Sequence, residues 1–275
     1  MTQDVVTLPA PAKVNLALVV GPRRPGGKHE VMTVLQALEL ADQVSVQRAE
    51  AVAVEGFADD TLVRAALEAI CARTGAAFAA TIEKQVPVAA GLGGGSADAA
   101  AALRGADALL DEPLAPDELH GIAARLGADV PFFLAGGTQL GTGDGTCLTS
   151  LALPTGYAVL LALPEGVRKA STGGVYAAFD ARQGERGFEE RVGRLREALG
   201  DVRDPRDLAR LPGNDLSSSP LADELRSLGA WRADVSGAGP AVYGLFPDAG
   251  TATAAAQRLA GSAQIWVTRP VGAHG

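Results

Sequence analysis

Pro87-Val88-Ala89-Ala90-Gly91-Leu92-Gly93-Gly94-Gly95-Ser96-Ala97-Asp98-Ala99-Ala100 is the stretch of this 275-residue chain that decides its fold. Four glycines within the five positions 91–95 remove side chains, so that backbone N–H groups can approach a ligand closely. The segment 96–110 follows without a proline, is rich in alanine, and predicts a long helix with Ser96 as its N-cap. The unpaired N–H groups and the positive dipole end of such a helix favour an anion. The stretch therefore predicts a loop that binds phosphate.

Three named phosphate loops differ from this one. A Walker loop needs Gly-Lys-Ser/Thr after its spacer, and no lysine stands here. The dinucleotide fingerprint needs glycine at its first, third and sixth positions, and the sixth is Ser96. The protein-kinase loop fails at the same position, and no His-Arg-Asp or Asp-Phe-Gly string follows. A plain flexible connector remains the alternative, which the immediate passage into a helix disfavours.

Outward from the loop, strand and helix patterns alternate along the chain. Thr61 is expected to cap a helix that ends before Gly75. The pattern restarts after about residue 150, so we expect an α+β fold with two domains, residues 1–152 and 153–275. Periodicity and turn residues predict strands at 14–20, 44–54, 78–88, 132–134, 138–140, 157–163, 233–235, 241–246 and 265–268. They predict helices at 61–73, 96–110, 116–126, 172–181, 188–199, 221–228 and 251–259.

Composition excludes several classes of function. The formal net charge is −8, so the chain has no general attraction to nucleic acid or to anionic lipid. Its two cysteines, Cys71 and Cys147, stand far apart, which argues against a disulfide framework or a structural zinc site. We recognise neither a targeting segment nor a run of about 20 apolar residues. We therefore expect a cytoplasmic protein, monomer or homodimer, whose partner is a small molecule.

Three motifs together resemble the GHMP kinase family, which includes galactokinase, homoserine kinase and mevalonate kinase. The glycine loop resembles the family pattern Pro-x-x-x-Gly-Leu-Gly-x-Gly/Ser-Ser. Pro11-Ala12-Lys13-Val14-Asn15-Leu16 and Ser236-Gly237-Ala238-Gly239-Pro240 stand where its other two motifs belong. The resemblance implies an N-terminal domain like the second domain of ribosomal protein S5 and a ferredoxin-like C-terminal domain. It also implies an ATP-dependent kinase acting on a small alcohol in the cleft between them.

Two further strings resemble one branch of that family, whose members phosphorylate a cytidine diphosphate-linked alcohol in isoprenoid biosynthesis. They are Leu126-Gly127-Ala128-Asp129-Val130-Pro131-Phe132-Phe133 and Gly213-Asn214-Asp215-Leu216. The resemblance implies that Asp129 is the catalytic base and that Lys13 assists it. Phosphoryl transfer does need a proton acceptor and charge stabilisation. From spacing alone, Asp129 is a turn residue. For Lys13 the alternative is a strand-end side chain that reaches solvent, but a lone lysine at the start of an apolar strand is costly unless paired, which favours a functional role.

The substrate side departs from the family at one position. His29 matches the histidine that holds cytosine in the family, but Lys28 stands where an aromatic residue precedes it. Tyr176 falls where the family has a second aromatic residue near the base, and Asn15, Thr172 and Gly237 complete the expected substrate contacts. Because lysine offers no ring face for stacking, a different alcohol with an anionic group remains an alternative. The other two alternatives for the function are a relative that binds a ligand without catalysis and a dinucleotide oxidoreductase.

The nucleotide side rests on the glycine loop and on two weaker positions. Asp60-Thr61-Leu62-Val63-Arg64-Ala65-Ala66 resembles a family stretch near the adenine, and Lys84 precedes the loop as a lysine often does there. ATP phosphates need neutralising, so Mg²⁺ is implied, with Ser96 as the best candidate ligand and no dedicated metal site. The residues expected to bind ATP are Thr61, Lys84, Pro87, Gly91, Leu92, Gly93, Gly94, Gly95 and Ser96.

Overall fold

A long hairpin of two strands runs through the whole molecule. The computed structural model describes residues 5–58, 60–166 and 171–272. Strand β1 (Val5–Arg23) pairs antiparallel with β2 (His29–Ala49), from Val5 opposite Gln47 to Arg23 opposite His29. The register shifts between Pro11 and Lys13 and again between Asn15 and Ala17. Irregular pairing of this kind bends a strand and re-aims its side chains, and here it falls on the residues of the first motif.

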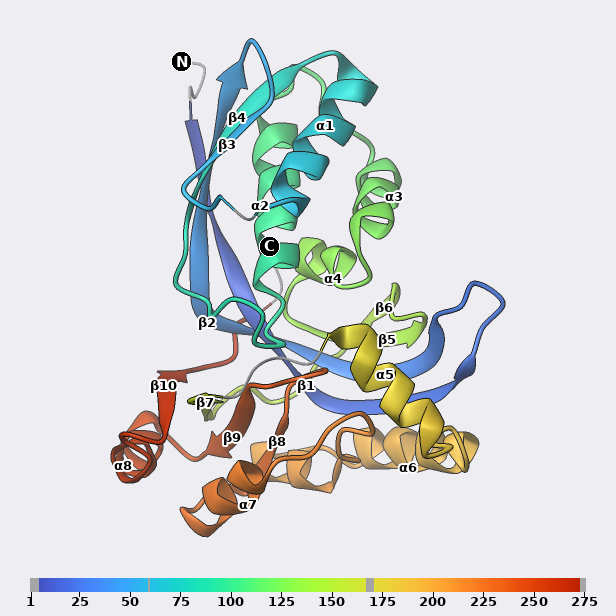
Figure 1. Cartoon of the computed structure of the whole chain (residues 1–275), viewed down its shortest axis with the longest axis vertical. Helices are drawn as coiled ribbons and strands as arrows, with labels where there is room; N and C mark the ends of the chain where they lie inside the picture. Colours follow the sequence, from blue (N-terminus) through green and yellow to red (C-terminus); the bar gives the residue numbers. More distant parts are fainter. Residues whose placement is uncertain (1–4, 59, 167–170, 273–275) are drawn as a thin grey trace.

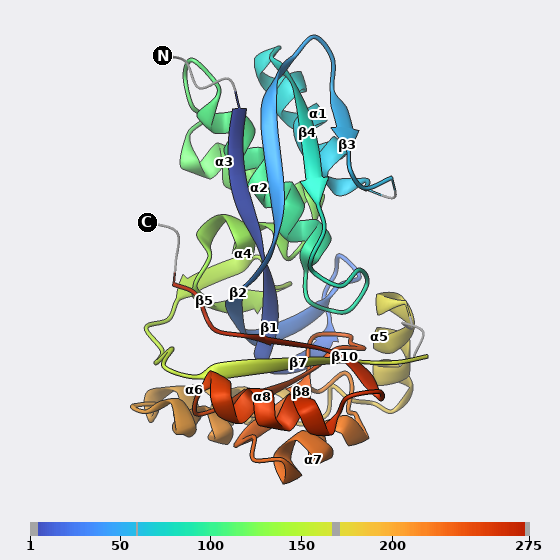
Figure 2. The same ribbon diagram turned by 90° about the vertical axis from the view of Figure 1, so that its left-hand side faces the viewer.

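The first sheet is built on this hairpin and carries four helices on one face (Figure 1, Figure 2). Its order is β3-β4-β2-β5-β6, with β1 pairing β2 beside that path. The further strands are β3 (Ala53–Glu55), β4 (Ala77–Glu83), β5 (Thr138–Gly143) and β6 (Cys147–Ser150). The helices are α1 (Leu62–Thr74), α2 (Gly94–Ala108), α3 (Pro116–Leu126) and α4 (Val130–Ala135).

The small side chains of α2 explain its place against the sheet. Ala97 and the run from Ala99 to Ala102 are buried, and so is Asp98. At Gly105 an added Cβ would lie 2.8 Å from Val46 Cγ2 on β2, so the helix can approach the sheet this closely only without that atom. The alanine-rich sequence therefore sets both the helix and its depth in the core.

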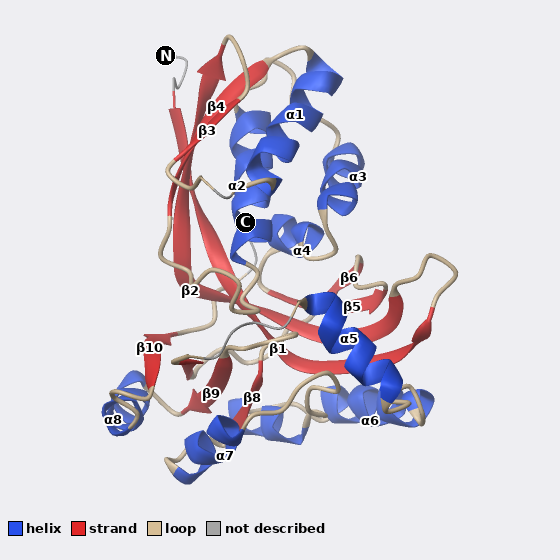
Figure 3. Cartoon of the chain, in the orientation of Figure 1, coloured by secondary structure: helices blue, strands red, loops and turns tan. Residues whose placement is uncertain are grey.

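The second sheet has the order β10-β7-β9-β8, and helices pack on its side away from the first sheet (Figure 1, Figure 3). Its strands are β7 (Ala158–Pro164), β8 (Arg232–Val235), β9 (Val242–Phe246) and β10 (Ala263–Thr268). The remaining elements are α5 (Thr172–Ala181), α6 (Phe188–Gly200), the 3₁₀ helix η1 (Pro205–Arg210), α7 (Pro220–Ser227) and α8 (Ala249–Arg258). Within the described residues, no helix is both long and apolar enough to cross a bilayer.

One hydrophobic cluster contains residues from both sheets. Val14 and Leu16 of β1 pack in the same buried cluster as Leu161 of β7 and Leu245 of β9. The guanidinium of Arg232, which is buried, adds hydrogen bonds to the carbonyl oxygens of Leu16, Leu208, Leu211 and Pro212. The division at residue 152 therefore stays an interpretation of the sequence, because the two halves share a core.

Most predicted elements form, and two helices have the predicted bounds, α3 and α5. The strand predicted at 132–134 is wrong: these residues lie in helix α4, whose first turn contains Pro131 and whose Phe132 and Phe133 are buried. The strand predicted at 78–88 ends at Glu83, and β5 extends through the predicted turn to Gly143.

One of the two predicted N-caps is wrong. Thr61 does stand at the N-cap position of α1. Its side chain makes no capping bond, however, and the carboxylate of Asp60 accepts from the N–H groups of Val63 (2.9 Å) and Arg64 (3.2 Å) instead. Helix α2 begins two residues before Ser96, at Gly94, and its N-cap is Gly93 in a left-handed conformation (φ 77°). Glycine supplies this conformation without the penalty of a Cβ, so the loop runs directly into the helix.

Candidate active site

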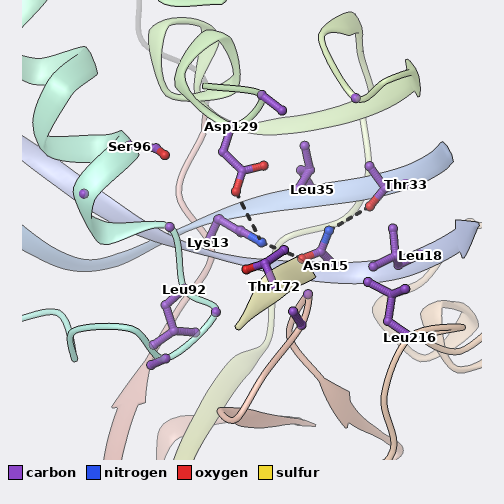
Figure 4. A pocket seen from close by; sticks show the side chains of 18 of the residues that line it. Lys13, Asn15, Leu18, Thr33, Leu35, Leu92, Ser96, Asp129, Thr172 and Leu216 are labelled. Atoms are coloured by element: carbon purple, nitrogen blue, oxygen red, sulfur yellow. Dashed lines mark hydrogen bonds and ion pairs between the residues drawn. The ribbon is translucent and has the colours of Figure 1, made fainter. Parts of the chain in front are cut away.

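A cavity of about 740 Å³ lies where the hairpin, the glycine loop, the start of α4 and the start of α5 meet (Figure 4). Every site residue expected from the sequence lines it except Thr61, whose neighbour Leu62 does. These residues come from both halves of the chain, since Thr172, Tyr176 and Gly237 follow residue 153. The fold thus places residues that are far apart in the sequence, such as Lys13 and Gly237, around one cavity.

The ammonium of Lys13 is held at the centre of this cavity by a chain of polar side chains. Lys13 is 4% exposed, and its Nζ donates to Asn15 Oδ1 at 2.6 Å. Asn15 Nδ2 donates to Thr33 Oγ1 at 2.8 Å, and Thr33 Oγ1 donates to the carbonyl oxygen of Ala17 at 2.8 Å. Figure 4 shows the contacts from Lys13 through Asn15 to Thr33. A buried charge needs such partners, and here they fix where the ammonium points.

Asp129 faces the same ammonium from α4. The distance from Lys13 Nζ to Asp129 Oδ2 is 3.9 Å, and the Asp129 side chain is 42% exposed. Asp129 stands at the N-cap position of α4, yet its side chain makes no capping hydrogen bond. The carboxylate is therefore not used to brace the turn, which was the alternative from spacing alone, and it projects into the cavity (Figure 4).

Two glycines of the loop are required because neighbouring atoms leave no room for a Cβ. Gly91 and Gly93 have φ values of 86° and 77°. A Cβ at Gly91 would lie 2.4 Å from the carbonyl oxygen of Ser236, and one at Gly93 would lie 2.6 Å from Phe133 Cζ. The backbone N–H of Lys13 also donates to the Leu92 oxygen at 2.9 Å. All three sequence motifs are consequently in contact through the loop.

Asn214 and Asp215 support this arrangement from outside the cavity, which Leu216 of the same string lines. Asn214 Nδ2 donates to the carbonyl oxygens of Val235 (2.9 Å) and Gly237 (2.6 Å), and so braces the third motif. Asp215 Oδ2 accepts from the N–H of Val20 at 2.8 Å and from Arg191 Nε at 3.0 Å. The resemblance at these positions thus reflects packing of the hairpin on the second half of the chain.

A buried ionic cluster joins the two ends of the glycine loop. Lys84 Nζ, before the loop, donates to Asp42 Oδ2 at 2.5 Å and to Asp98 Oδ2, after the loop, at 2.7 Å. Asp42 Oδ1 also accepts from the N–H groups of Gln85 (2.5 Å) and Val86 (2.8 Å). Asp42 and Asp98 are 0% and 1% exposed. The sequence had no signal for this cluster, since its members are far apart and lie on different elements.

Burial dominates the protonation of Asp98. It raises the pKa of Asp98 to about 7, although the hydrogen bond and the charge of Lys84 act in the opposite direction. Asp98 Oδ1 is enclosed and has no hydrogen-bond partner. For Lys84, burial alone would lower the pKa, but the two carboxylates outweigh it and raise the pKa overall. The ammonium of Lys84 is therefore charged and engaged by both carboxylates.

The far end of the cavity carries an ion pair, a contact between a histidine and a carboxylate, and stacked rings. Lys28 Nζ lies 2.7 Å from Asp144 Oδ2, and this pair holds the pKa of Asp144 down at about 2. His29 Nε2 lies 2.7 Å from Asp180 Oδ1, and its ring stacks on Tyr176 with centroids 4.7 Å apart. Neither Asp144 nor Asp180 was singled out from the sequence. Only the fold reveals both partners, because each is more than 100 positions from its lysine or histidine.

Comparisons with known proteins agree with these motifs. Residues 61–137 match the family model described as GHMP kinases N terminal domain, and residues 195–263 match GHMP kinases C terminal. A protein of Nocardia farcinica named 4-diphosphocytidyl-2-C-methyl-D-erythritol kinase is 42% identical over 94% of this chain and 90% of its own. Its namesake in Moorella thermoacetica is 39% identical over 93% and 95%.

Solved structures share the fold. A crystal structure of 4-(cytidine 5'-diphospho)-2C-methyl-D-erythritol kinase is 31% identical, with a TM-score of 0.79 over 97% of this chain and 100% of that one. Homoserine kinase from Cytophaga hutchinsonii, at 16% identity, has a TM-score of 0.72 over 100% and 98%, which shows the fold alone. The predicted two-domain α+β fold is confirmed.

The raised pKa of Asp98 predicts a pH-dependent stability difference. The folded state holds the Asp98 proton more tightly than the unfolded chain, so this contribution is complete below about pH 4 and is lost as the pH rises through about 7. Asp98→Asn stays neutral and keeps an acceptor for Lys84. We therefore expect its free energy of unfolding, relative to wild type, to rise by about 1–3 kcal/mol from pH 5 to pH 8.

Urea denaturation at the two pH values measures this difference. Asp201→Asn, at an exposed carboxyl after α6, is the matched control and should show none. A difference between Asp98→Asn and wild type that does not change with pH would contradict the assignment.

Proposed function

This chain belongs to the GHMP kinase family, and on that premise we propose which reaction its cavity performs. It is an ATP-dependent small-molecule kinase. Its substrate is 4-diphosphocytidyl-2-C-methyl-D-erythritol, a hydroxyl of which it phosphorylates in isoprenoid biosynthesis. The main observation behind this proposal is the pair of Lys13 and Asp129, whose Nζ and Oδ2 atoms lie 3.9 Å apart. The pair lines the same cavity as the glycine loop and the rings of His29 and Tyr176. The near full-length identity of about 40% to kinases of that name supports it.

The glycine loop and the start of α2 bind the triphosphate. Gly91 to Ser96 line the cavity, and the N–H groups and positive dipole end of α2 suit the phosphates. Lys84 contributes by joining the two ends of this loop, while Pro87 and the segment after Thr61 border the nucleotide.

Mg²⁺ would accompany the nucleotide and would neutralise phosphate charge. Within the described residues, no group of three or more acidic, histidine or cysteine side chains could hold a metal ion. Mg²⁺ commonly takes one or two protein ligands together with substrate phosphates and water. Ser96, which lies in the first turn of α2 and lines the cavity, would be such a ligand.

Phosphoryl transfer follows from the positions of the two charged groups. The substrate hydroxyl oxygen attacks the γ-phosphorus while the bond to the β,γ-bridging oxygen breaks, and ADP leaves. Asp129 accepts the hydroxyl proton, and the Lys13 ammonium stabilises the negative charge on the transferring group. Asn15 keeps that ammonium directed at the reacting atoms. Tyr176 stays a neutral phenol, since burial and the charge of Asp129 raise its pKa to about 12.

The far end of the cavity takes the cytidine base. His29 and Tyr176 contact the base there, while Thr172 and Gly237 border the rest of the substrate. The positive charge of Lys28 is matched by Asp144 at 2.7 Å, which disfavours the alternative of an alcohol with an anionic group at that end. We propose that the enzyme acts in the cytoplasm, as a monomer or a homodimer.

Gly94→Val tests the phosphate loop. A Cβ at Gly94 would already lie 3.3 Å from Val86 Cγ1 and from Lys84 Nζ, and the valine methyl groups crowd both further. To relieve this crowding, the loop or its neighbours must shift, which displaces the backbone N–H groups that meet the phosphates, so we expect calorimetry to show ATP binding weakened by roughly 10-fold or more. Gly193→Val on α6, where nothing lies within 4 Å, is the control. Unchanged ATP affinity in a folded Gly94→Val protein would refute the loop assignment.

Asp129→Asn tests the proton acceptor. The amide keeps the size of the side chain but loses its charge and basicity, so we expect kcat to fall by about 10²-fold or more. Calorimetric ATP affinity should change little, because the glycine loop remains intact. Asp223→Asn, at an exposed site on α7, should retain full turnover. If Asp129→Asn turns over like wild type, another group accepts the proton.

Lys28→Tyr tests the base subsite. A tyrosine ring at this position would provide the stacking face that lysine lacks, worth about 1–3 kcal/mol per base. We expect the KM for the cytidine substrate to fall by roughly 5- to 150-fold with kcat unchanged. Because Asp144 then loses its partner, Lys28→Tyr should be compared with Lys28→Met, which removes the same charge without adding a ring. Equal KM values for the two variants would mean that the base does not stack at position 28.

A further inference from the structure

Helix α5 presents one face to the hairpin at the far end of the cavity. Thr172, Tyr176 and Asp180 recur at intervals of four residues, which places them on one side of the helix. Thr172 and Tyr176 line the cavity, and Asp180 reaches the first residue of β2, His29. Figure 1 shows α5 lying across the end of the β1–β2 hairpin. A helix from the second half of the chain therefore contacts the residue that meets the base.

Asp180 contacts two side chains through its two carboxylate oxygens. Oδ1 lies 2.7 Å from His29 Nε2, while Oδ2 accepts from Arg23 Nε at 3.0 Å and from Arg23 Nη2 at 2.5 Å. Arg23 and His29 are opposite each other in the hairpin register. The hydrogen bonds from Arg23 and then from His29 lower the pKa of Asp180, so the carboxylate is ionised.

This contact determines where the imidazole proton resides. An ionised carboxylate only accepts hydrogen bonds, so the hydrogen of a neutral His29 ring is on Nε2 and the lone pair is on Nδ1. The ring is held in place by Tyr176, stacked at 26° to it, and by Phe179, edge-on with centroids 5.9 Å apart. Within the described residues, Nδ1 accepts no hydrogen bond and is not among the enclosed polar atoms that lack a partner. Nδ1 is thus an oriented acceptor on a residue that lines the cavity.

We propose that Asp180 is the positioning residue that sets base specificity, by fixing the His29 tautomer in which Nδ1 accepts a hydrogen bond from the exocyclic amino group of the base. Cytosine offers that amino group. Uracil has a carbonyl oxygen at the same place and would set one acceptor against another. A site built to pair a polar group discriminates strongly against an analogue that leaves the group unpaired. This inference rests on the proposed function, because it assumes a pyrimidine nucleotide substrate.

Nitrogen NMR tests the tautomer without any substrate. The chain has three histidines, at 29, 120 and 274, so histidine labelled with ¹⁵N gives few signals and His29→Gln assigns the one of interest. At pH 8 we expect the His29 ring to show a protonated Nε2 and an unprotonated Nδ1. In Asp180→Ala the two nitrogens should move toward averaged shifts, and in Asp180→Glu they should return to the wild-type pattern. A wild-type ring protonated on Nδ1, or an unchanged pattern in Asp180→Ala, would overturn the proposal.

Kinetics test the specificity with the cytidine diphosphate substrate and its uridine counterpart. We expect Asp180→Ala to raise the KM for the cytidine substrate by about 10-fold and to reduce the preference over uridine by at least that factor, leaving kcat and the KM for ATP unchanged. Asp180→Glu should restore most of the preference, and Asp223→Ala should behave as wild type. Asp180 is one-third exposed, so its truncation leaves the core intact. An unchanged preference would reduce Asp180 to an anchor for α5.

The two arms separate this proposal from the proposed function. If wild-type enzyme phosphorylates neither nucleotide substrate but does phosphorylate another alcohol, the function fails and the specificity role of Asp180 fails with it. If wild-type enzyme uses the cytidine compound and Asp180→Ala does so with the same preference, only the role of Asp180 fails.

Discussion

A lysine ammonium that is 4% exposed is the constraint around which this cavity is organised. Such a charge is costly to bury unless it is paired and hydrogen-bonded, so the fold must bring acceptors to it. Asn15 supplies one from the same strand, Thr33 orients that amide from the partner strand, and Asp129 supplies the negative charge from α4. The backbone of Lys13 also fixes the glycine loop through Leu92. Satisfying one buried cation therefore aligns the proton acceptor, the hairpin and the phosphate loop.

The cavity uses charge differently at its two ends. Near the phosphate loop, Lys84 lies between two buried carboxylates and fastens the loop at both of its ends, which leaves the helix N-terminus to meet the anion. At the base end, Lys28 is matched by Asp144 and Arg23 by Asp180, so no net positive field is added there. The strongest local attraction for a polyanion is thus at the loop, and the base end selects by rings and by the direction of its hydrogen bonds.

The sequence could predict those features whose residues lie close together along the chain. The glycine loop, Lys13 and Asp129 lie in short contiguous strings. Their roles were inferred because those strings resemble one family. Helices α3 and α5 were predicted with their bounds because their periodicity is local. Helix α4 was missed because two adjacent phenylalanines suggest a strand when nothing shows that they pack under α2. Asp144, Asp180 and the cluster of Asp42 with Asp98 depend on contacts across the fold, which no local pattern carries.

The core shared between the two sheets has a consequence for how this enzyme can be divided. Val14 and Leu16 of β1 pack with Leu161 and Leu245 of the second sheet. The Arg232 guanidinium also donates a hydrogen bond to the carbonyl oxygen of Leu16. A fragment cut at the sheet boundary would expose apolar surface that the hairpin now covers. Chimaeras with a relative would have to exchange β1 together with the second half. The part of this molecule that can be inherited or exchanged as a unit therefore includes the β1–β2 hairpin and is larger than either sheet.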